Sequence, residues 1–360
     1  MGIEGLWGLI QNLSFKQTLK NFNTEYRFMK NADNAHAPVV GVDASVFLDT
    51  FHAANKSMQT RTQNLHTSDT TLTQFYHFLC QLSEAGLHCI FCFDGSERPP
   101  YKWNRKVIHR KSSHYKHAET LIKLFGFHAF TAKGDADAEL ANLNRKGAIN
   151  AVLTKDSDIF PFGATCILRL VVEVYDTTTI QERTGISQGG FILMALLLQN
   201  DISKGISGIG ARTAYGLAQC GFGDSILDAA FQYPAATIPT AFKEINNQMA
   251  TEIKLNSHGK IGSCSPARSH KLRTSEFPSL QDLTEIKAFA RPPTLSDIPT
   301  YLPKLPDIEG IASFCREYFA WSSELTFKKF HASLWPAVIV QMLCSVSILT
   351  HIFPEMYVLM

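Results

Sequence analysis

The chain has 360 residues, of which 45% are hydrophobic, and its formal net charge is +2. This composition excludes an intrinsically disordered chain and leaves room for one large domain or two ordinary ones. So small a net charge does not identify a nucleic-acid-binding protein, because phosphate binding depends on where the charge lies.

Eight cysteines are scattered along the chain, and the opening MGIEGLWGLI lacks the basic-then-apolar layout of a secretory signal. We therefore expect an intracellular, reducing environment. Cys89 and Cys92 form a C-x-x-C, but the run HCIFCFD is typical of a strand, in which positions three apart point to opposite faces. With no second pair to complete a zinc site, no structural metal is expected there.

Four continuously apolar runs end in acidic or small polar residues, which predicts buried parallel strands. In chain order they are APVVGVDAS, LHCIFCFDGS, FGFHAFTAKGD and INAVLTKDSD. Helix-length segments lie between them at Thr71 to Gly86 and His114 to Gly126, and a helical pattern follows Asp135. This alternation predicts an α/β fold, with a central, mostly parallel sheet flanked by helices.

The rest of the chain carries helical patterns. Residues 189–232 indicate helix, glycine-rich turn and helix, and so a second, all-α module. Residues 254–273 hold five Lys or Arg and no acid, which favours a mobile basic linker. The segment 308–346 again predicts helices. The most apolar part of the region, 334–349, is short for a bilayer span and contains a proline and a glutamine, so we expect a buried helix.

Acidic residues stand at the ends of the predicted strands. Asp43, Asp94 and Asp156 each end a strand, at the edge where open α/β sheets bind ligands. Asp135 and Asp137 open the helix after the third run, and Asp158 follows two residues after Asp156. As many as six carboxylates would then face one crevice and repel one another unless cations neutralised them.

Carboxylate oxygens without nearby Cys or His favour Mg²⁺ or Mn²⁺ as the cation. Two such ions about 4 Å apart activate water and stabilise the leaving oxygen in phosphodiester hydrolysis. Taken singly, each acid has a structural alternative: Asp135 as a helix cap, and Asp94, before Gly95, as a turn residue. The repetition at strand ends favours the metal site.

A basic stretch runs from Glu97 to Lys123, with eight Lys or Arg against two Glu and with Tyr101, Trp103 and Tyr115 interspersed. Cations that attract phosphates and aromatics that stack on bases suit DNA held beside an acidic site, although a solvated helix face is the alternative.

A glycine-rich turn, GISGIG at residues 205–210, precedes a helical pattern and closely follows Asp201. Its amides can approach a phosphate at the start of the next helix, and an ordinary helix–helix turn is the alternative.

Five blocks of the sequence occur in the order and at the spacing of one protein family. They are MGIEGLW, VGVDAS, FCFDGSERPPYK, GDADAELANLNRKGAINAVLTKDSDIFPFGA and LLLQNDISKGISGIGARTA. Together they resemble the XPG/flap-endonuclease (Rad2) superfamily, and most closely its fungal XPG-like and Holliday-junction-resolvase branch. The resemblance implies a PIN-like nuclease core, a helix-two-turn-helix module and a helical C-terminal region.

The resemblance also implies site residues. Lys102 matches a basic residue that contacts the scissile phosphate, with Arg105 or Arg110 as its partner. Gly2 matches a glycine that packs near the active site. The implied duplex grip, with a potassium ion, involves Gly205, Ser207, Gly208, Gly210, Arg212 and Thr213. The implied metal ligands are Asp43, Asp94, Asp135, Asp137, Asp156, Asp158 and Asp201.

The implied function is Mg²⁺-dependent cleavage of DNA at 5′-flaps or four-way junctions in repair or recombination, with nuclear localisation and a possible dimer on the junction. One departure bears on it: Asp135 and Asp137 stand where the family has glutamates, one methylene longer. Two alternatives follow: a catalytically impaired junction-binding protein, and an RNA-directed PIN-like nuclease, which would not need the glycine turn.

Domain boundaries follow from the same patterns. We expect an N-terminal nuclease region, a basic arch-like segment, an internal nuclease region, the helix-two-turn-helix module, a basic linker and a helical C-terminal region. The expected bounds, in that order, are 1–100, 101–126, 127–195, 196–250, 251–275 and 276–360.

Overall fold

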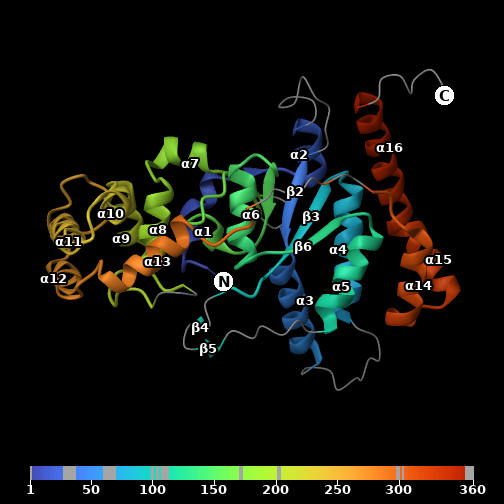
Figure 1. The fold of residues 1–360 in the computed structure, drawn as a ribbon, viewed down its shortest axis with the longest axis horizontal. Helices are drawn as coiled ribbons and strands as arrows, with labels where there is room; N and C mark the ends of the chain where they lie inside the picture. Colours follow the sequence, from blue (N-terminus) through green and yellow to red (C-terminus); the bar gives the residue numbers. More distant parts are fainter. Residues whose placement is uncertain are drawn as a thin grey trace.

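The computed structural model describes residues 2–26, 38–59, 70–98, 101–102, 105–106, 113–169, 173–200, 204–296, 301 and 304–352. A seven-stranded sheet lies at its centre, in the order β1-β9-β8-β7-β2-β3-β6 (Figure 1). The strands are β1 (Phe15–Lys16), β2 (Val39–Asp43), β3 (His88–Phe93), β6 (His128–Thr131), β7 (Ala151–Leu153), β8 (Cys166–Arg169) and β9 (Glu173–Asp176). A separate hairpin pairs β4 (Tyr101–Lys102) with β5 (Arg105–Lys106).

Strand direction follows the predicted pattern in the middle of the sheet. The strands β6, β3, β2, β7 and β8 are parallel, whereas β9 and β1 are antiparallel to their neighbours. The four apolar runs form β2, β3, β6 and β7, so the predicted α/β fold with a mostly parallel sheet is confirmed.

Successive side chains along each strand point to opposite faces of the sheet, so the sheet contributes to two hydrophobic cores, one on each face. Along β3, Ile90 and Cys92 belong to one core, while Cys89 and Phe91 belong to the other. The two cysteines of the C-x-x-C therefore point to opposite faces, as expected.

Helices cover both faces (Figure 1). The first core contains residues of α1 (Leu6–Ile10), α6 (Ala136–Arg145) and the α8–α13 group. The second core contains residues of α2 (Leu19–Glu25), α3 (Ala44–Gln59), α4 (Thr70–Glu84), α5 (Ser113–Leu124), α14 (Ile308–Phe319) and α16 (Trp335–Ile352). The α8–α13 group consists of α8 (Gln188–Leu197), α9 (Ala211–Gln219), α10 (Phe222–Gln232), α11 (Ile238–Leu255), α12 (Pro266–Thr274) and α13 (Leu280–Ala290). The remaining elements are η1 (Gln11–Leu13), η3 (Ser157–Ile159), α7 (Thr177–Thr184), α15 (Ser323–Lys329) and η4 (Phe330–Leu334).

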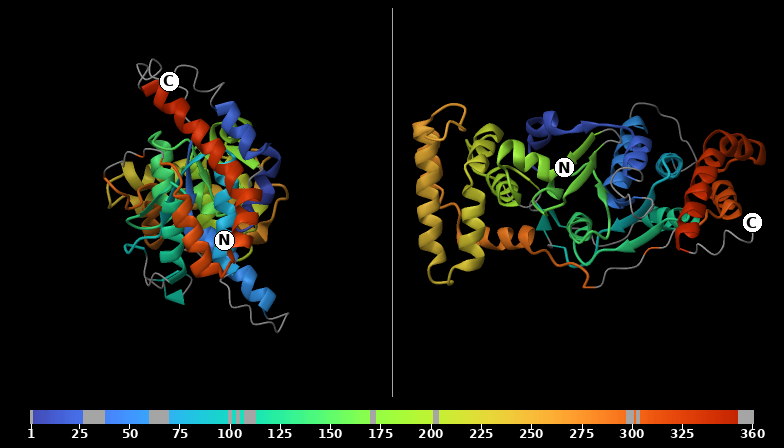
Figure 2. Two further views of the ribbon diagram at one scale, coloured as in Figure 1. Left: turned by 90° about the vertical axis from the view of Figure 1, so that its right-hand side faces the viewer. Right: turned by 90° about the horizontal axis from the view of Figure 1, so that it is seen from above.

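The molecule is elongated, with the sheet between two helical ends. The ribbon in Figure 1 and the right-hand view in Figure 2 place α11 and α12 at one end and α14 to α16 at the other.

The structure corrects the expectation of a mobile linker at residues 254–273. This stretch contains the end of α11 and most of α12, and Ser269 and Leu272 of α12 are buried. The side chain of Ser265 caps α12 by accepting from the Arg268 amide, and Pro266 occupies its first turn. A helix so polar gives almost no periodic signal, which is why the sequence pattern missed it.

The basic arch-like segment, 101–126, also differs from expectation at its end. Residues 113–124 form α5, whose Ala118, Leu121 and Ile122 are buried against the sheet. This part belongs to the nuclease core. The hairpin β4–β5 lies outside the central sheet.

The apolar segment 334–349 forms most of α16, and over residues 334–343 only one face of it is buried. Ala337 and Val338 face the core, whereas Ile339 is 55% exposed and Leu343 is 67% exposed. The expectation of a buried helix is therefore wrong for one of its faces. Among the described residues, no helix is long and apolar enough to cross a membrane.

Candidate active site

The order in which the chain adds strands to the sheet reverses at β2, which is the topological switch point of the sheet. From β2 the chain adds β3 and β6 on one side, then crosses to add β7 and β8 on the other. In such sheets the crevice at the carboxyl ends of the strands, beside this switch point, is the usual ligand site. Asp43 is the last residue of β2, Asp94 follows β3 directly, and Asp156 lies three residues after β7.

Two carboxylates of this crevice are buried deeply enough to resist ionisation. Burial raises the pKa of Asp43 well above its ordinary value, and the charges of Asp94 and Asp156 raise it further. Burial likewise raises the pKa of Asp137, followed by the charges of Asp43, Asp156, Asp158 and Asp94. Because each group acts on the others, these five carboxylates form one electrostatic cluster.

Asp94 is held at both of its oxygens. Its Oδ1 accepts from the amide of Ala136 at 3.1 Å, and its Oδ2 is 2.7 Å from Nη1 of Arg98. The Arg98 side chain is only 17% exposed, so the ion pair is shielded from solvent. Arg98 therefore neutralises one carboxylate of the cluster and fixes its position.

The remaining predicted acids lie on two adjacent elements. Asp135 is the N-cap residue of α6, with Asp137 in the first turn of that helix. The side chain of Asp156 caps η3 by accepting from the amide of Asp158 at 3.1 Å. Asp156 and Asp158 are both buried.

The N-terminal segment packs directly on the cluster. Gly2 has φ +84°, and a Cβ atom built there would lie 2.3 Å from Oδ1 of Asp156 and 2.4 Å from Oγ of Ser157. The amide of Ile3 donates to Ser157 Oγ at 2.8 Å. Only glycine fits this position, in both space and backbone conformation, which agrees with the expectation that Gly2 lies near the active site.

The carboxylate oxygens of this cluster suit a hard divalent cation as its ligands. The Oδ1 atom of Asp137 is buried and accepts no hydrogen bond from the described residues. Such an oxygen, surrounded by other carboxylates, is costly without a cation. Asp43, Asp94, Asp137, Asp156 and Asp158 therefore fit Mg²⁺ or Mn²⁺.

The glycine-rich turn lies on the next element along the chain. Gly205 and Gly208 have φ +65° and +89°, so both need the left-handed region that favours glycine. Ser207, Gly208 and Gly210 are exposed, and Arg212 follows them in the first turn of α9. The turn therefore presents backbone and polar side chains to solvent at the start of α9.

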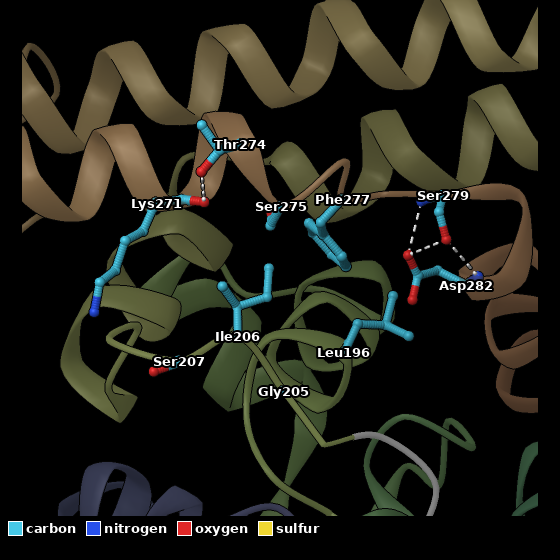
Figure 3. Close-up of a pocket in the computed structure, with 10 residues that line it drawn as sticks. All are labelled: Leu196, Gly205, Ile206, Ser207, Lys271, Thr274, Ser275, Phe277, Ser279 and Asp282. Atoms are coloured by element: carbon cyan, nitrogen blue, oxygen red, sulfur yellow. Dashed lines mark hydrogen bonds between the residues drawn. The ribbon is translucent and has the colours of Figure 1, made fainter.

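A pocket of about 500 Å³ adjoins this turn, between α8, α12 and α13 (Figure 3). Ile206 and Ser207 line it from the turn, and Lys271 lines it from α12. The Nζ atom of Lys271 lies 3.1 Å from the position that a Cβ atom of Gly208 would occupy. Lys271 thus places a cation directly against the turn.

Thr213, one of the residues implied for the duplex grip, points into the protein. It is buried, and its hydroxyl accepts a hydrogen bond from Arg268 of α12. Its side chain ties α9 to α12 and does not face solvent.

Several predicted residues are only partly covered by the structure. Lys102 and Arg105 are paired in register across β4 and β5, and the description there is limited to the backbone. Arg110 and Asp201 lie outside the described residues.

Two sequence families together match more than half of this chain. The XPG N-terminal domain matches residues 1–117, and the XPG I-region matches residues 126–201. The first match ends within α5 and the second begins just before β6, and together they span every described acid of the cluster. The chain belongs to the XPG/Rad2 superfamily.

Named relatives within the superfamily are nucleases or repair proteins. Flap endonuclease 1 of Drosophila ananassae is 26% identical over 258 residues, covering 59% of this chain and 63% of that protein. The DNA repair protein RAD2 of Saccharomyces cerevisiae is 24% identical over 216 residues, covering 58% of this chain and 20% of that protein. The chain thus spans less than two thirds of the length of these relatives.

A solved structure supports the same fold. The Holliday junction-resolving enzyme GEN1, in complex with product DNA and Mg²⁺, superposes with a TM-score of 0.68 at 24% identity. The match covers 94% of this chain and 79% of GEN1. At this identity the likeness shows the XPG/Rad2 nuclease-core fold.

Sequence patterns do not single out three residues at the site. Arg98 and Lys271 stand within runs of basic residues, where nothing distinguishes them from their neighbours. Glu139, in the first turn of α6, is buried, and its Oε2 accepts from the amide of Leu295 at 2.9 Å. It ties the segment after α13 to the helix that carries Asp137, and its place two residues after Asp137 is the one signal that could have found it.

The raised pKa values of Asp43 and Asp137 predict an unusual pH dependence of stability. The folded chain holds protons that the unfolded chain releases above about pH 4, so stability decreases as pH rises from that value through the raised pKa values. Without divalent metal we expect the Tm to fall across this range, and saturating Mg²⁺ should remove the trend. Thermal denaturation at several pH values, with chelator or with Mg²⁺, measures it.

Matched variants test the cause. Asp137→Asn should flatten the decline in chelator, whereas Asp228→Asn, an exposed acid on α10, should leave it unchanged. Equal pH profiles for Asp137→Asn and the wild type would contradict this assignment.

Proposed function

We propose that this chain is a Mg²⁺-dependent, structure-specific DNA endonuclease that hydrolyses phosphodiesters at 5′-flaps or four-way junctions. The observation that carries the proposal is the gathering of Asp43, Asp94, Asp137, Asp156 and Asp158 into one cluster at the switch point of the sheet. The family and the nuclease names of its relatives support it.

The chain's own residues have distinct roles in this proposal. When bound, two divalent cations supply an activated water and stabilise the leaving oxygen. Asp43 is held in place by burial, Asp137 is placed by the first turn of α6, and Arg98 fixes Asp94. Lys102 is proposed to hold the scissile phosphate, as the family resemblance implies.

The glycine turn is proposed as the duplex grip. Its exposed amides and hydroxyl, together with Lys204, Arg212 and Lys271, form a polar, basic surface that suits the phosphate backbone. A potassium ion at residues 205–210 is part of the proposal, and it is supported by the solved structure of a similar junction-resolving enzyme, GEN-1, with potassium. A nuclear location is proposed from the DNA-repair name of a relative, and a dimer on the junction is proposed from the family resemblance.

One observation favours a second candidate, a junction-binding protein with impaired catalysis. Asp137 stands where a longer glutamate is usual, and burial raises its pKa well above the ordinary range. A protonated or retracted carboxylate binds cations weakly. Binding without cleavage would support this candidate.

Removing single acids tests the nuclease proposal. Asp94→Ala and Asp156→Ala should each lower the cleavage rate by at least about a hundredfold, the scale on which loss of one electrostatic stabiliser acts. Binding of the same junction should persist. Labelled 5′-flap and four-way-junction substrates with Mg²⁺, resolved on denaturing gels, measure cleavage, and Asp228→Ala is the control. Wild-type protein that binds both substrates but cuts neither, with Mg²⁺ or Mn²⁺, would refute the proposal.

Gly2 should be essential for the geometry of the cluster. Gly2→Ala introduces a methyl group that must displace Asp156 or Ser157. A shift of about 1 Å in a reacting group costs on the order of a hundredfold in rate. Gly8→Ala is the matched control, because no atom lies within 4 Å of its added methyl group. Single-turnover cleavage rates of Gly2→Ala and Gly8→Ala measure the effect. Equal rates for the two variants would show that Gly2 does not position Asp156.

Lys271 should contribute to DNA affinity without sequence preference. Lys271→Ala removes one cation beside the turn, so the slope of log affinity against log salt should fall by about one. Lys328→Ala, on α15 at the opposite end of the molecule (Figure 1), should have no effect. Fluorescence anisotropy with junction DNA at several salt concentrations measures both, and an unchanged slope for Lys271→Ala would remove this residue from the binding surface.

A further inference from the structure

A second group of metal-ligating side chains lies far from the carboxylate cluster. Cys220, Glu252 and His258 place their ligand atoms within 4.8 Å of one another. Cys220 ends α9, Glu252 lies on the last turns of α11, and His258 lies in the loop that follows. This end of the molecule is remote from the carboxyl edge of the sheet (Figures 1 and 2).

We propose that Cys220, Glu252 and His258 form a zinc-binding site that clamps the α9–α10 turn to the end of α11. Thiolate, imidazole and carboxylate together are the ligands that Zn²⁺ takes in proteins, and sulfur disfavours Mg²⁺. Three protein ligands leave a fourth position for water.

Two of the three ligands are already close. His258 Nδ1 lies 2.9 Å from Glu252 Oε2, and the His258 amide donates to Glu252 Oε1 at 3.0 Å. Ligand atoms around tetrahedral zinc are separated by roughly 3.5 Å, given bond lengths of about 2.0–2.3 Å. A movement of about 1 Å would bring the Cys220 sulfur from the 4.8 Å limit to this separation.

The surrounding backbone is fixed, which lowers the entropic cost of binding. Asn256 ends α11 with φ 52°, and its Oδ1 accepts from the amide of Ile261 at 2.8 Å. Ile261 is fully buried. The carbonyl of Lys260 lies 2.5 Å from where a Cβ atom of Gly216 would be, so the loop packs directly on α9. His258 is thus held close to Glu252 before any ion arrives.

Zinc binding at this site would be coupled to release of a proton from Cys220. Burial acts to raise the pKa of Glu252, but the hydrogen bonds from His258 outweigh it and lower that pKa. Burial and the charge of Glu252 raise the pKa of the Cys220 thiol to about 11. Zinc would take the thiolate, releasing the Cys220 proton to solvent, so affinity should rise with pH. The side chain of His258 is 60% exposed, which leaves a path for the ion.

Co²⁺ as a spectroscopic probe tests the site in the full chain, with excess Mg²⁺ present to occupy the carboxylate cluster. We expect a near-ultraviolet charge-transfer band from thiolate to Co²⁺ that Zn²⁺ displaces. Cys220→Ser should abolish the band, and Cys264→Ser, an exposed cysteine of the same module, should retain it. His258→Gln should lower Zn²⁺ affinity by at least about tenfold, since loss of even an outer-shell partner costs that much.

The outcomes separate the proposal from a simple hydrogen-bonded pair. Absence of the band in the wild type, or an equal band in Cys220→Ser, would overturn the site. Circular dichroism of each variant without metal confirms folding, and His258→Gln alters an exposed side chain, so its loss of affinity reports on ligation. Because Cys220 lies outside the cluster, the result is independent of whether the chain cuts DNA.

Discussion

The mutual repulsion of buried carboxylates is the constraint on which the rest of this structure depends. Two like charges about 5 Å apart repel by roughly 3 kcal/mol at an effective dielectric constant of about 20, and a cluster contains several such pairs. Burial, and after it the charges of the neighbouring carboxylates, raises the pKa of Asp43 and of Asp137, and Asp94 is paired with Arg98. The protein has therefore placed a destabilising feature at the edge of its sheet, as expected of a site built to bind a cation.

Such a cluster persists only where packing over-determines its geometry. The parallel strands β2, β3 and β7 fix where Asp43, Asp94 and Asp156 emerge, because their hydrogen-bond register cannot slip without turning buried side chains to the other face. Gly41 supports this register: a side chain there would meet Leu140 and Ile149 within 2.6 Å. The helix that carries Asp137 consequently lies close against the central strand.

The sequence patterns predicted the strands encoded by long apolar runs, including β6 at the sheet's edge, which is only half buried. They missed elements encoded by shorter or more polar segments. The four strands that bear or precede the acids are continuously apolar and gave a clear signal. The strands β8 and β9 are half-exposed at their ends and near the sheet's edge, and α12 is stabilised by its cap and by Leu272. Arg98 could not be distinguished from the neighbouring basic residues in the sequence. Its pairing with Asp94 depends on the turn after β3, whose conformation is set by the folded structure.

The N-terminal segment links the acid cluster to the glycine turn. Gly2 and Ile3 contact Asp156 and Ser157, and the amide of Glu4 donates to the carbonyl of Gln199 at 3.2 Å. Gly5 then packs on α9, where its Cβ position lies 3.1 Å from Cβ of Ala211. Four consecutive residues thus join the carboxyl edge of the sheet to the helix that follows the turn. In the proposed function, a duplex held at the turn would meet the carboxylates at a distance set by this packing, and the cleavage position would follow from that spacing without any reading of base sequence.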